Sequence, residues 1–552
     1  MRWLLNDKFE ITLISNSNLK TKKIFLISLI FTFCILPFIP FQTINGLDGL
    51  AVPSNTFILL PISLFTFIYF LAHRSEINVS TITSKLTIIC LIMFFYITFK
   101  QGLTLNSVYT RISYILLLAL VIQLLYWIKP NKHTITKIII FSLLIQCLYG
   151  FIQISNLGLQ NDFIFYFERP VGSFAQVNIM ASTLAIGLIF ALYQNLNHEH
   201  SKNTKILISS FIIISPSIIT LCSSRTAYIS LAICLTIFFV CNCREIFKNH
   251  LSLLIKLGSG FFLAILLFLI MENSHKDLES LKSPGIRLDM YLNSLIMFIE
   301  KPFLGWGFGS YIYSFYYSIY DNSLIYDFIN PIDSLSTHPH NELALWGIEG
   351  GIIGIIFICT ILYIFIKALI KFKCNSDTAF GSGLVVLLPL LLHIMLEHPM
   401  YTSSLYGLYF CLFFYIYTTP ENKKENTLHT RIIGVIFAVK SVLLVPIIIV
   451  ILQSSLLSTA YLKTGNRAIR DMIISDFPSR LYLIQMDLLI KTHNARVNED
   501  YISLEELNNQ IFENLKTIPA KSLASDYLNN CNILSNCEKN NIEFINRYFN
   551  IL

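Results

Sequence analysis

The residues best suited to chemistry lie in one short stretch of the chain. From residue 337 it reads Thr-His-Pro-His-Asn-Glu-Leu-Ala-Leu-Trp-Gly-Ile-Glu-Gly-Gly-Ile-Ile-Gly, and His338 and His340 stand directly before an apolar helix predicted from 343 to about 366. Histidine can exchange a proton near neutral pH. The start of a helix offers free N–H groups and a partial positive charge to a phosphate. The stretch therefore predicts a reaction site, and the alternative is an ordinary polar loop that leads into a helix.

The same stretch also contains residues that would hold such a site together. Asn341 follows the second histidine, and Glu342 and Glu349 place two carboxylates seven residues apart. Two pairs of glycines, each four residues apart, lie between residues 347 and 354. Small residues at this spacing let another helix approach the backbone closely. We therefore expect one face of the predicted helix to pack tightly against a second helix.

The composition of the chain indicates a membrane protein. Of its 552 residues 54% are hydrophobic and only 13% are charged, with a mean hydropathy of +0.63, which excludes an ordinary soluble protein. Apolar runs long enough to cross a bilayer recur along the chain. We predict an all-α polytopic fold with 12 or 13 transmembrane helices, at about 24–41, 56–72, 84–100, 107–128, 135–154, 177–194, 206–222, 226–242, 251–271, 343–366, 380–396, 402–418 and 432–452.

The distribution of lysine and arginine predicts the orientation of these spans. Basic residues gather in alternate connections, which the positive-inside rule assigns to the cytoplasm. This distribution accounts for the net charge of +7 without a nucleic-acid partner. No cleavable signal peptide is evident, so the N-terminus is expected inside and the first apolar run is expected to be a span. The inner connections contain Lys20, Lys22, Lys23, Arg74, Lys85, Lys129, Lys132, Lys137, Lys202, Lys205, Arg244, Lys248, Lys367, Lys371, Lys373, Lys423, Lys424 and Arg431.

The predicted spans divide the chain into two parts. Residues 1–452 form the expected membrane domain, with one large outer loop at 272–342, and residues 453–552 form a small helical domain on the outer side. The loop contains an amphipathic stretch near 285–299 and a tyrosine-rich run at 311–326, which could lie on the membrane interface. In the tail we expect helices within 460–492, broken near Pro478, and at 504–515 and 522–528.

Cysteines are expected to have a structural role only. Ten of the twelve are scattered through spans and their edges without the spacing of metal ligands, so no metal site is predicted. Cys531 and Cys537 lie together in the outer tail, where an oxidising compartment would allow them to form a disulfide. The alternative is a pair of free thiols.

Three arginines are expected on the same outer side as His340. Arg169 and Arg287 lie in outer loops, and Arg225 stands between two spans in Cys-Ser-Ser-Arg-Thr. The planar guanidinium group suits phosphate oxygens. Together with a helix N-terminus they predict a site for a lipid diphosphate. The alternative is snorkelling to the interface, which we also expect for Arg111 and Lys100.

A further set of polar residues falls near the outer end of the span 380–396. His393, Glu397 and Tyr401 are four residues apart along the sequence, so they would share one face of a helix. We expect them to line the same cavity or to anchor the helix end at the interface.

These motifs resemble those of one family. His340-Asn341, nine residues, Gly351, two residues and Gly354 resemble the signature of the bacterial O-antigen ligase and polymerase superfamily. The fuller His-Pro-His-Asn-Glu-Leu form resembles the branch of pilin-type protein O-oligosaccharyltransferases. Other segments resemble that branch in the same order: Arg169-Pro170-x-Gly172-x-Phe174-x-Gln176-x-Asn178, Ser224-Arg225-Thr226, Arg287-Leu288-Asp289 and Pro302-Phe303-Leu304-Gly305-Trp306-Gly307.

The resemblance, which covers about residues 150–420, implies a reaction. It implies transfer of a glycan from undecaprenyl diphosphate to a hydroxyl acceptor at the periplasmic face of the bacterial inner membrane, without a cofactor or an obligatory metal. His340 matches the essential histidine of the family, Arg225 and Arg287 match arginines thought to hold the diphosphate, and Gln176 matches an outer-loop glutamine. His398 stands where this branch often has tyrosine, which leaves the role of that position and the acceptor preference open.

The expected mechanism assigns one residue to proton transfer. If its pKa is near neutral, His340 takes the proton from an acceptor serine or threonine as the hydroxyl attacks the anomeric carbon. Arg225 and Arg287, with Arg169, stabilise the charge on the leaving diphosphate. Inversion at the anomeric carbon would follow. The substrate-binding or supporting residues are Gln176, Asn178, His338, Asn341, Glu342, Glu349, Glu397, His398 and Tyr401.

Other functions remain open from the sequence. The expected acceptor is a pilin-like or other periplasmic protein, which the outer tail could dock. An O-antigen ligase would instead use lipid A core, and a polymerase would use a second lipid-linked repeat. A transporter would also have many spans and buried charge, but it should show paired half-sequence repeats and helices broken at midplane. The sequence shows neither.

Overall fold

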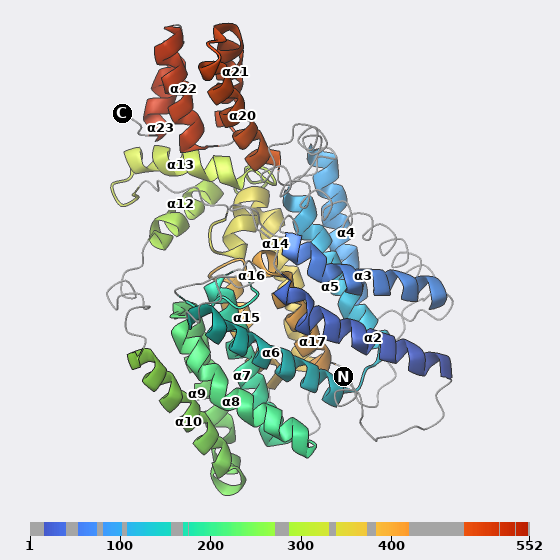
Figure 1. Ribbon diagram of the computed structural model, residues 1–552. Coiled ribbons are helices and arrows are strands. Elements are labelled where there is room, and N and C mark those ends of the chain that lie inside the picture. The colour runs from blue at the N-terminus through green and yellow to red at the C-terminus, as the bar shows by residue number, and fades with distance from the viewer. Residues whose placement is uncertain are drawn as a thin grey trace.

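The computed structural model describes most of the chain. It describes residues 16–39, 53–73, 81–101, 107–155, 169–174, 176–270, 286–330, 338–371, 382–418, 480–517, 519–535 and 537–549. Within these ranges every regular element is a helix (Figure 1). The expected all-α polytopic class is therefore confirmed.

The apolar helices agree with the predicted spans. Eight helices of the described residues are long and apolar enough to cross a membrane, and four shorter apolar helices accompany them. Together they match twelve predicted spans, and the thirteenth, 432–452, lies outside the described residues. The helices are α2 Asn16–Cys34 with the 3-10 helix η1 Leu36–Phe38, α3 Pro53–His73, α4 Thr81–Gln101, α5 Ser107–Ile128, α6 Lys132–Ile154, α7 Val177–Asn197, α8 Lys202–Leu221, α9 Arg225–Asn249, α10 Leu251–Ile270, α14 Glu342–Lys371, α15 Ser382–Ile394 and α17 Ser404–Thr418.

Helix α7 is the most enclosed of the eight long helices. Of its apolar span 89% is buried inside the protein, and it packs against α6, α8, α9, α15 and α17. A polar side chain on such a helix cannot reach water and must find a protein partner. Ser182, which is fully buried in this helix, contacts His393 of α15 in this way, and the half-buried Asn178 donates to Glu397.

The predicted outer loop contains two helices, α12 Arg287–Glu300 and α13 Tyr311–Ile325. Both pack against α14 and against each other, and Figure 1 shows α13 lying across the upper end of the bundle. Met290, Asn293, Ser294 and Met297 recur at helical spacing and form the buried face of α12. The loop thus places the first residue of α12, Arg287, next to the membrane helices.

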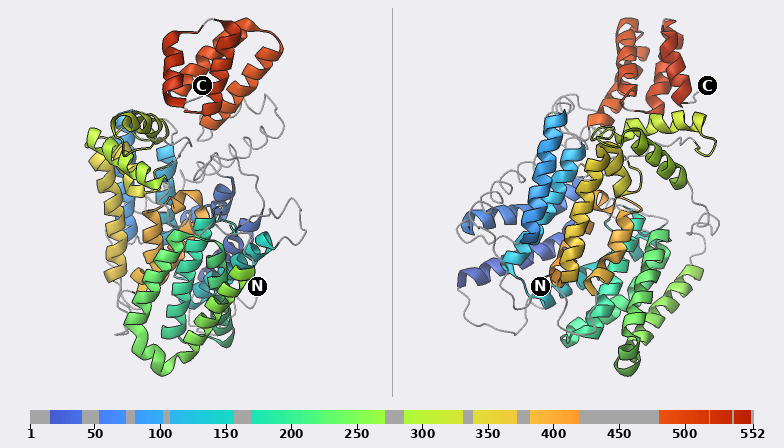
Figure 2. Two further views of the ribbon diagram at one scale, coloured as in Figure 1. Left: turned by 90° about the vertical axis from the view of Figure 1, so that its left-hand side faces the viewer. Right: turned by 180° about the vertical axis from the view of Figure 1, so that it is seen from behind.

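The tail contributes four helices beside α13, as Figure 2 shows from two further directions. They are α20 Arg480–Val497, α21 Tyr501–Leu515, α22 Lys521–Leu534 and α23 Lys539–Phe549. They contain the three later stretches expected to be helical, whereas residues 460–479 and the break near Pro478 lie outside the described residues. A disulfide joins Cys531 and Cys537.

The tyrosine-rich run of α13 packs against the tail. The Tyr316 ring lies 5.5 Å from that of Phe549, and the Tyr548 hydroxyl donates to Asp321 over 3.0 Å. The expected position of these tyrosines on the membrane interface is therefore wrong for Tyr316. Protein rings, rather than lipid headgroups, bury it.

Helix α14 is kinked at Gly351, about three turns after His340. Gly351 has φ 60° and ψ −147°, and the N–H of Ile352 donates to the carbonyl of Pro302 over 2.7 Å. The N–H of Trp306 donates to the carbonyl of Ile348 over 2.8 Å. The glycines of α14 do permit a close approach, but at the kink the chain that approaches is the loop 301–309 rather than a helix. This loop fills the gap because its own N–H and C=O groups can bond the backbone that the kink exposes.

We predict that Gly351→Ala destabilises the protein. The φ of +60° disfavours any side chain, and a Cβ at this position would lie 2.5 Å from the carbonyl carbon of Phe303. Backbone strain of this kind costs about 1–3 kcal/mol before the steric contact is added. Thermal unfolding of the purified protein in detergent measures the loss.

The matched control for this variant is Gly258→Ala in α10. Beyond the neighbouring backbone of α10, no described part of the chain comes within 4 Å of a Cβ at this position, and alanine favours a helix by up to about 1 kcal/mol over glycine. Its melting temperature should stay level or rise. Equal melting temperatures for both variants would show that the backbone conformation at the kink does not require glycine at position 351.

Candidate functional site

The turn before α14 holds the two histidines in place. Asn341 caps the helix, because its Oδ1 accepts from the N–H of Ala344 over 3.0 Å, while its Nδ2 donates to the carbonyl of Met395 over 2.9 Å. The hydroxyl of Tyr291 on α12 donates to the carbonyl of His340 over 3.2 Å. His340 itself has φ +52°, in the left-handed region. The turn is thus fixed by α14, by the end of α15 and by α12.

Three histidine rings gather at this turn. The His338 ring lies 4.6 Å from that of His340 and 4.5 Å from that of His398, measured between centroids. His398 donates from Nδ1 to Glu342 over 2.7 Å. Nδ1 of His340 and Nε2 of His398 are buried, and neither has a hydrogen-bond partner among the described residues. Buried nitrogens without partners cost free energy, so both are suited to receive a ligand group.

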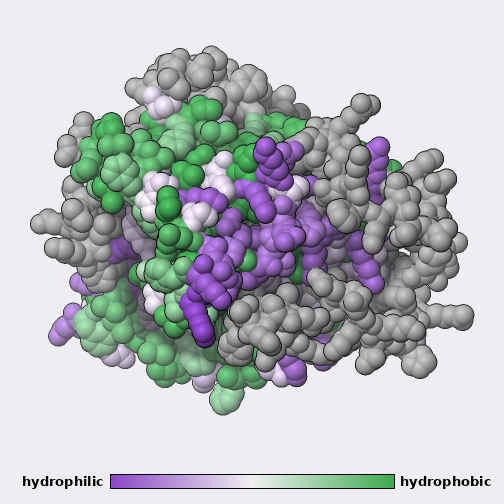
Figure 3. Space-filling model, turned by 90° about the horizontal axis from the view of Figure 1, so that it is seen from below, coloured by the Kyte–Doolittle hydropathy of each residue, from purple (hydrophilic) through white to green (hydrophobic). Residues whose placement is uncertain are grey.

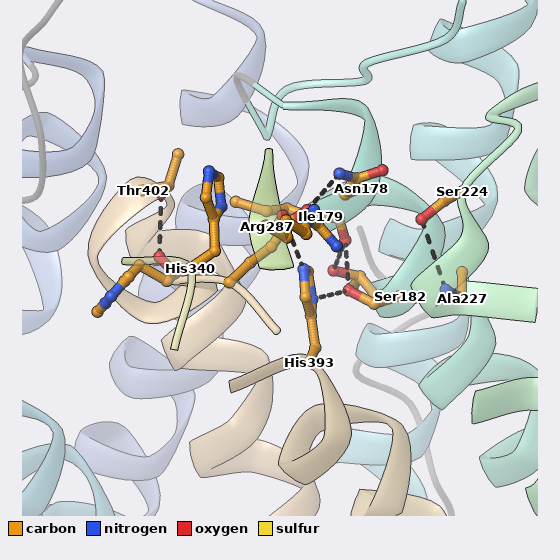
Figure 4. Close-up of polar contacts among 12 residues, drawn as sticks. Asn178, Ile179, Ser182, Ser224, Ala227, Arg287, His340, His393 and Thr402 are labelled. Carbon is orange, nitrogen blue, oxygen red and sulfur yellow. Dashed lines mark hydrogen bonds and ion pairs between the residues drawn. The ribbon is translucent and has the colours of Figure 1, made fainter. Parts of the chain in front are cut away.

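Side chains from three helices, Arg287, Asn178 and His393, meet around one buried carboxylate, as the positions of these three residues in Figure 4 show. Glu397 is 1% exposed and accepts from Arg287 over 2.9 Å and from Nε2 of His393 over 3.1 Å. The Nδ2 of Asn178, at the start of α7, also donates to it. Ser182, one turn further along α7, contacts Nδ1 of His393 over 2.6 Å. Glu397 thereby links α12, α7 and the end of α15 beside His340.

A second buried ion pair lies beneath the histidines. Arg111 of α5 donates to Glu349 over 2.9 Å, and both side chains are nearly enclosed. The carbonyl of Glu349 accepts from the N–H of Gly307 over 3.0 Å. Glu349 therefore ties α5 and the loop 301–309 to α14. Arg111, which was expected to snorkel to the interface, is instead buried, because Glu349 neutralises its charge.

The expected helical line from His393 to Tyr401 is interrupted. Helix α15 ends at Ile394, and Tyr401 belongs to a separate short helix, α16 Pro399–Thr402. Pro399 begins α16 because proline fits the first turn of a helix but not its interior. Tyr401 still reaches the site, where its ring centroid lies 5.9 Å from that of His398 and 6.1 Å from that of Tyr114.

Arg169 and Arg225 form a neighbouring group rather than part of the Glu397 network. Arg169 donates to the carbonyl of Cys222 over 3.4 Å, just before α9 begins at Arg225. Figure 4 places the start of α9, marked by Ser224 and Ala227, beyond Ser182 as seen from His340. Among the three arginines, Arg287 is the one whose ion pair lies in the site.

Two glutamines of α6, which the sequence analysis did not select, hold the loop after Arg169. Oε1 of Gln153 accepts from the N–H groups of Val171 and Gly172 over 3.0 and 2.7 Å. Gln146 accepts from the N–H of Ser173 over 3.0 Å. Their seven-residue spacing within an apolar span was the available signal. Gln176 follows this loop as the residue before α7, without a side-chain hydrogen bond to the helix.

Charge and burial set the proton affinity of the site. Burial, then the positive charge of Arg287, lowers the pKa of His340 to about 4, although Glu397 opposes the shift. The condition of a near-neutral pKa, on which the expected role of His340 as a base depends, is therefore not met in this arrangement. Burial alone would raise the pKa of Glu397, but the hydrogen bond from His393 and the charges of His393 and Arg287 outweigh it and lower that pKa. The site thus holds an ionised carboxylate beside a neutral imidazole at neutral pH.

The chemistry available here is proton acceptance beside positive charge. His340 offers an unprotonated nitrogen, and Arg287 offers a cation that is only partly satisfied by Glu397. The start of α14, expected to seat a phosphate, is partly occupied, because Asn341 takes the N–H of Ala344. Within the described residues, no group of three or more histidine, cysteine or acidic side chains is arranged to hold a metal ion.

We predict that His340 stays reactive toward diethylpyrocarbonate, which modifies neutral imidazole, well below pH 6. Its lowered pKa of about 4 should keep the labelling rate flat down to pH 5, whereas N-acetylhistidine in the same tube loses reactivity around pH 6.5. Arg287→Gln removes a charge that lowers the pKa of His340, so the labelling midpoint should move up. Mass spectrometry of the His340 peptide measures the labelling rate in the wild type and in the variant. A wild-type labelling midpoint near pH 6.5 would contradict the lowered pKa of His340.

Comparison with known proteins adds a family to this geometry. Residues 209–359 match the model of a family described as O-antigen ligase (Wzy_C), and no curated protein matches the chain. The matched segment contains Arg225, Arg287, His340 and Glu349, and its family supports a transferase of the ligase type. With its many apolar helices, the chain is a multi-pass membrane protein. Residues 209–359 therefore match the O-antigen ligase family, and the expected resemblance to the O-antigen ligase and polymerase superfamily is confirmed.

Proposed function

We propose that this protein transfers a glycan from undecaprenyl diphosphate to serine or threonine hydroxyls of a periplasmic, pilin-like protein. The observation that carries the proposal is the buried, unpartnered Nδ1 of His340 beside Arg287, within a segment that matches O-antigen ligases. A base and a cation side by side suit a reaction in which a hydroxyl loses a proton while a diphosphate leaves.

The proposed reaction uses His340 as the base. The acceptor oxygen bonds to the anomeric carbon, and its proton passes to His340. The bond between that carbon and the diphosphate oxygen breaks, and its electron pair stays on the diphosphate, which Arg287 stabilises. Attack opposite the leaving group inverts the anomeric configuration. Arg225 and Arg169 are proposed to hold the more distant part of the donor.

The charge of the donor would also prepare the base. The positive charge of Arg287 lowers the pKa of His340, and a diphosphate bound to Arg287 would offset that charge. The pKa of His340 would then rise toward neutrality, where general bases work best. On this account His340 becomes a competent base only once the donor is in place, which limits unproductive reaction with water.

The supporting residues have separate proposed roles. Glu397 and Asn178 hold Arg287 against the site, and Glu342 orients His398 through its Nδ1. His338 lies between the rings of His340 and His398 and is proposed to contact the acceptor. Glu349 acts through α14, because its carboxylate is taken up by Arg111.

The proposed setting is the bacterial inner membrane, with the N-terminus in the cytoplasm and the site and the tail in the periplasm. The lysine and arginine distribution supports this orientation. The disulfide between Cys531 and Cys537 suits an oxidising compartment. An O-antigen ligase acting on lipid A core, or a polymerase, would share the same chemistry at the diphosphate, so the acceptor decides between them.

We predict that His340→Ala lowers the rate of glycan transfer by about a hundredfold or more, the usual contribution of a general base. Intact mass of envelope glycoproteins and a lipopolysaccharide gel, from cells with the gene intact, deleted and substituted, measure the loss. Loss of a glycan from a pilin-like protein with unchanged lipopolysaccharide supports the proposal. His250→Ala, at the other end of α9, is the control and should transfer normally. Full transfer by His340→Ala at normal expression would refute the assigned role.

We further propose that residues 453–552 form a domain that presents the acceptor, and that α13 seats it. Phe549 is fully buried against Tyr316, and Phe549→Ala removes packing worth about 3–5 kcal/mol. The variant should raise the acceptor KM, measured with purified enzyme and lipid-linked donor, more than it lowers kcat. Ile502→Ala, 86% exposed on α21, is the matched control. Unchanged acceptor kinetics in Phe549→Ala would remove the docking role.

A further inference from the structure

A basic hollow lies at the opposite end of α7 from His340. Asn178 stands at the first turn of α7 and His198 follows its last residue, so the rise of an α-helix puts about 30 Å between them. Beside this far end lies a hollow of 460 Å³, lined by His200, Lys202, Lys205, Ser209, Ser210 and two isoleucines. It is therefore separate from the candidate transfer site.

Positive charge is concentrated at the mouth of the hollow. Lys202 and Lys205 are exposed, and among the described residues no carboxylate pairs with either. The His200 ring lies 5.3 Å from that of His133 and 6.1 Å from that of His198. Both of its nitrogens are buried. The two exposed lysines of this mouth are donors that an anion can reach.

The hollow changes character along α8. Its lining residues at 202, 205, 206, 209, 210 and 213 recur every three or four positions, so they follow one face of the helix. The order runs from lysine, through the hydroxyls of Ser209 and Ser210, to Ile213, while Ile206 is 55% exposed beside them. Helix α8 is long and apolar enough to cross a membrane. A groove on its side would thus face lipid rather than water.

Figure 3 shows this end of the molecule, seen from below. Hydrophilic residues gather near the centre of the face, with hydrophobic residues around much of them. The end of α9 carries basic residues as well, Arg244 and Lys248, and neither of them lines this hollow. The positive-inside rule explains why basic residues lie at this end. It does not explain a groove in which lysines, serine hydroxyls and isoleucines follow one another.

We propose that this groove binds an anionic phospholipid. Its phosphate would lie among His200, Lys202 and Lys205, its glycerol ester oxygens near Ser209 and Ser210, and one acyl chain along Ile206 and Ile213. Basic pockets between membrane helices are suited to such headgroups. A free phosphate shares the headgroup chemistry but has nothing to place on the isoleucines. The bound lipid would brace the packing of α6, α7 and α8, which meet at this end.

The test uses the full-length protein, purified in detergent and stripped of lipid. Dioleoyl-phosphatidylglycerol, dioleoyl-phosphatidylcholine and inorganic phosphate are added separately. Native mass spectrometry then counts retained lipid, and thermal unfolding measures the shift in Tm. We expect retention and a raised Tm with phosphatidylglycerol, and much less of either with phosphatidylcholine, which has the same chains without net charge.

Variants separate the groove from general basicity. Lys202→Gln with Lys205→Gln should weaken retention of phosphatidylglycerol on the order of tenfold, because each lysine contributes to headgroup binding. Lys248→Gln, at the same end on α9, is the matched control and should retain it. Equal retention of the two lipids, or undiminished retention in the double variant, would overturn the proposal. A Tm shift by inorganic phosphate as large as that by phosphatidylglycerol would also overturn it, in favour of a phosphate site.

Discussion

The site depends on one buried charge. A carboxylate as enclosed as Glu397 would cost several kcal/mol if it stood alone. One partner, His393, is four residues away, but Arg287 of α12 and Asn178 of α7 are 110 and 219 residues away. The helices must pack together to bring these partners to Glu397. In turn, Glu397 can stay ionised in the interior only because the partners are there. The same pairing aims Arg287 at His340, and through its charge it sets the proton affinity of that ring.

A second constraint transmits this arrangement through the fold. The kink at Gly351 frees backbone groups of α14, which bond the loop 301–309, and this loop joins α12 to α13. The pair of Arg111 and Glu349 holds α5 against the same turn of α14. The large outer loop is therefore fastened to α14 between Ile348 and Ile352, beneath the histidines. The contacts that hold the fold together here also serve the site, because the loop 301–309 continues from α12, the helix that begins with Arg287.

The sequence predicted local features well and distant partnerships poorly. The positions of the spans could be predicted because a run of apolar residues in the sequence is enough to identify a membrane helix. The predicted span 177–194, for example, lies within α7, Val177–Asn197. The contact between His393 and Glu397 followed from helical spacing. The partner of Glu349 could not be predicted, since Arg111 lies 238 residues away. The kink at Gly351 was missed for a similar reason: the bonds that stabilise it come from another loop. The lowered pKa of His340 could not be predicted, because burial and the charge of Arg287 act together only in the folded chain.

The left-handed backbone of His340 has a consequence for the balance between stability and activity. Histidine at φ +52° is held in a conformation that glycine, and to a lesser degree asparagine, adopts more readily. Selection for a stable turn alone would favour one of those residues, so the imidazole is retained at a small energetic disadvantage. An inactive His340→Asn protein would then be at least as heat-resistant as the parent, and such a form could trap the enzyme with an intact donor for structural work.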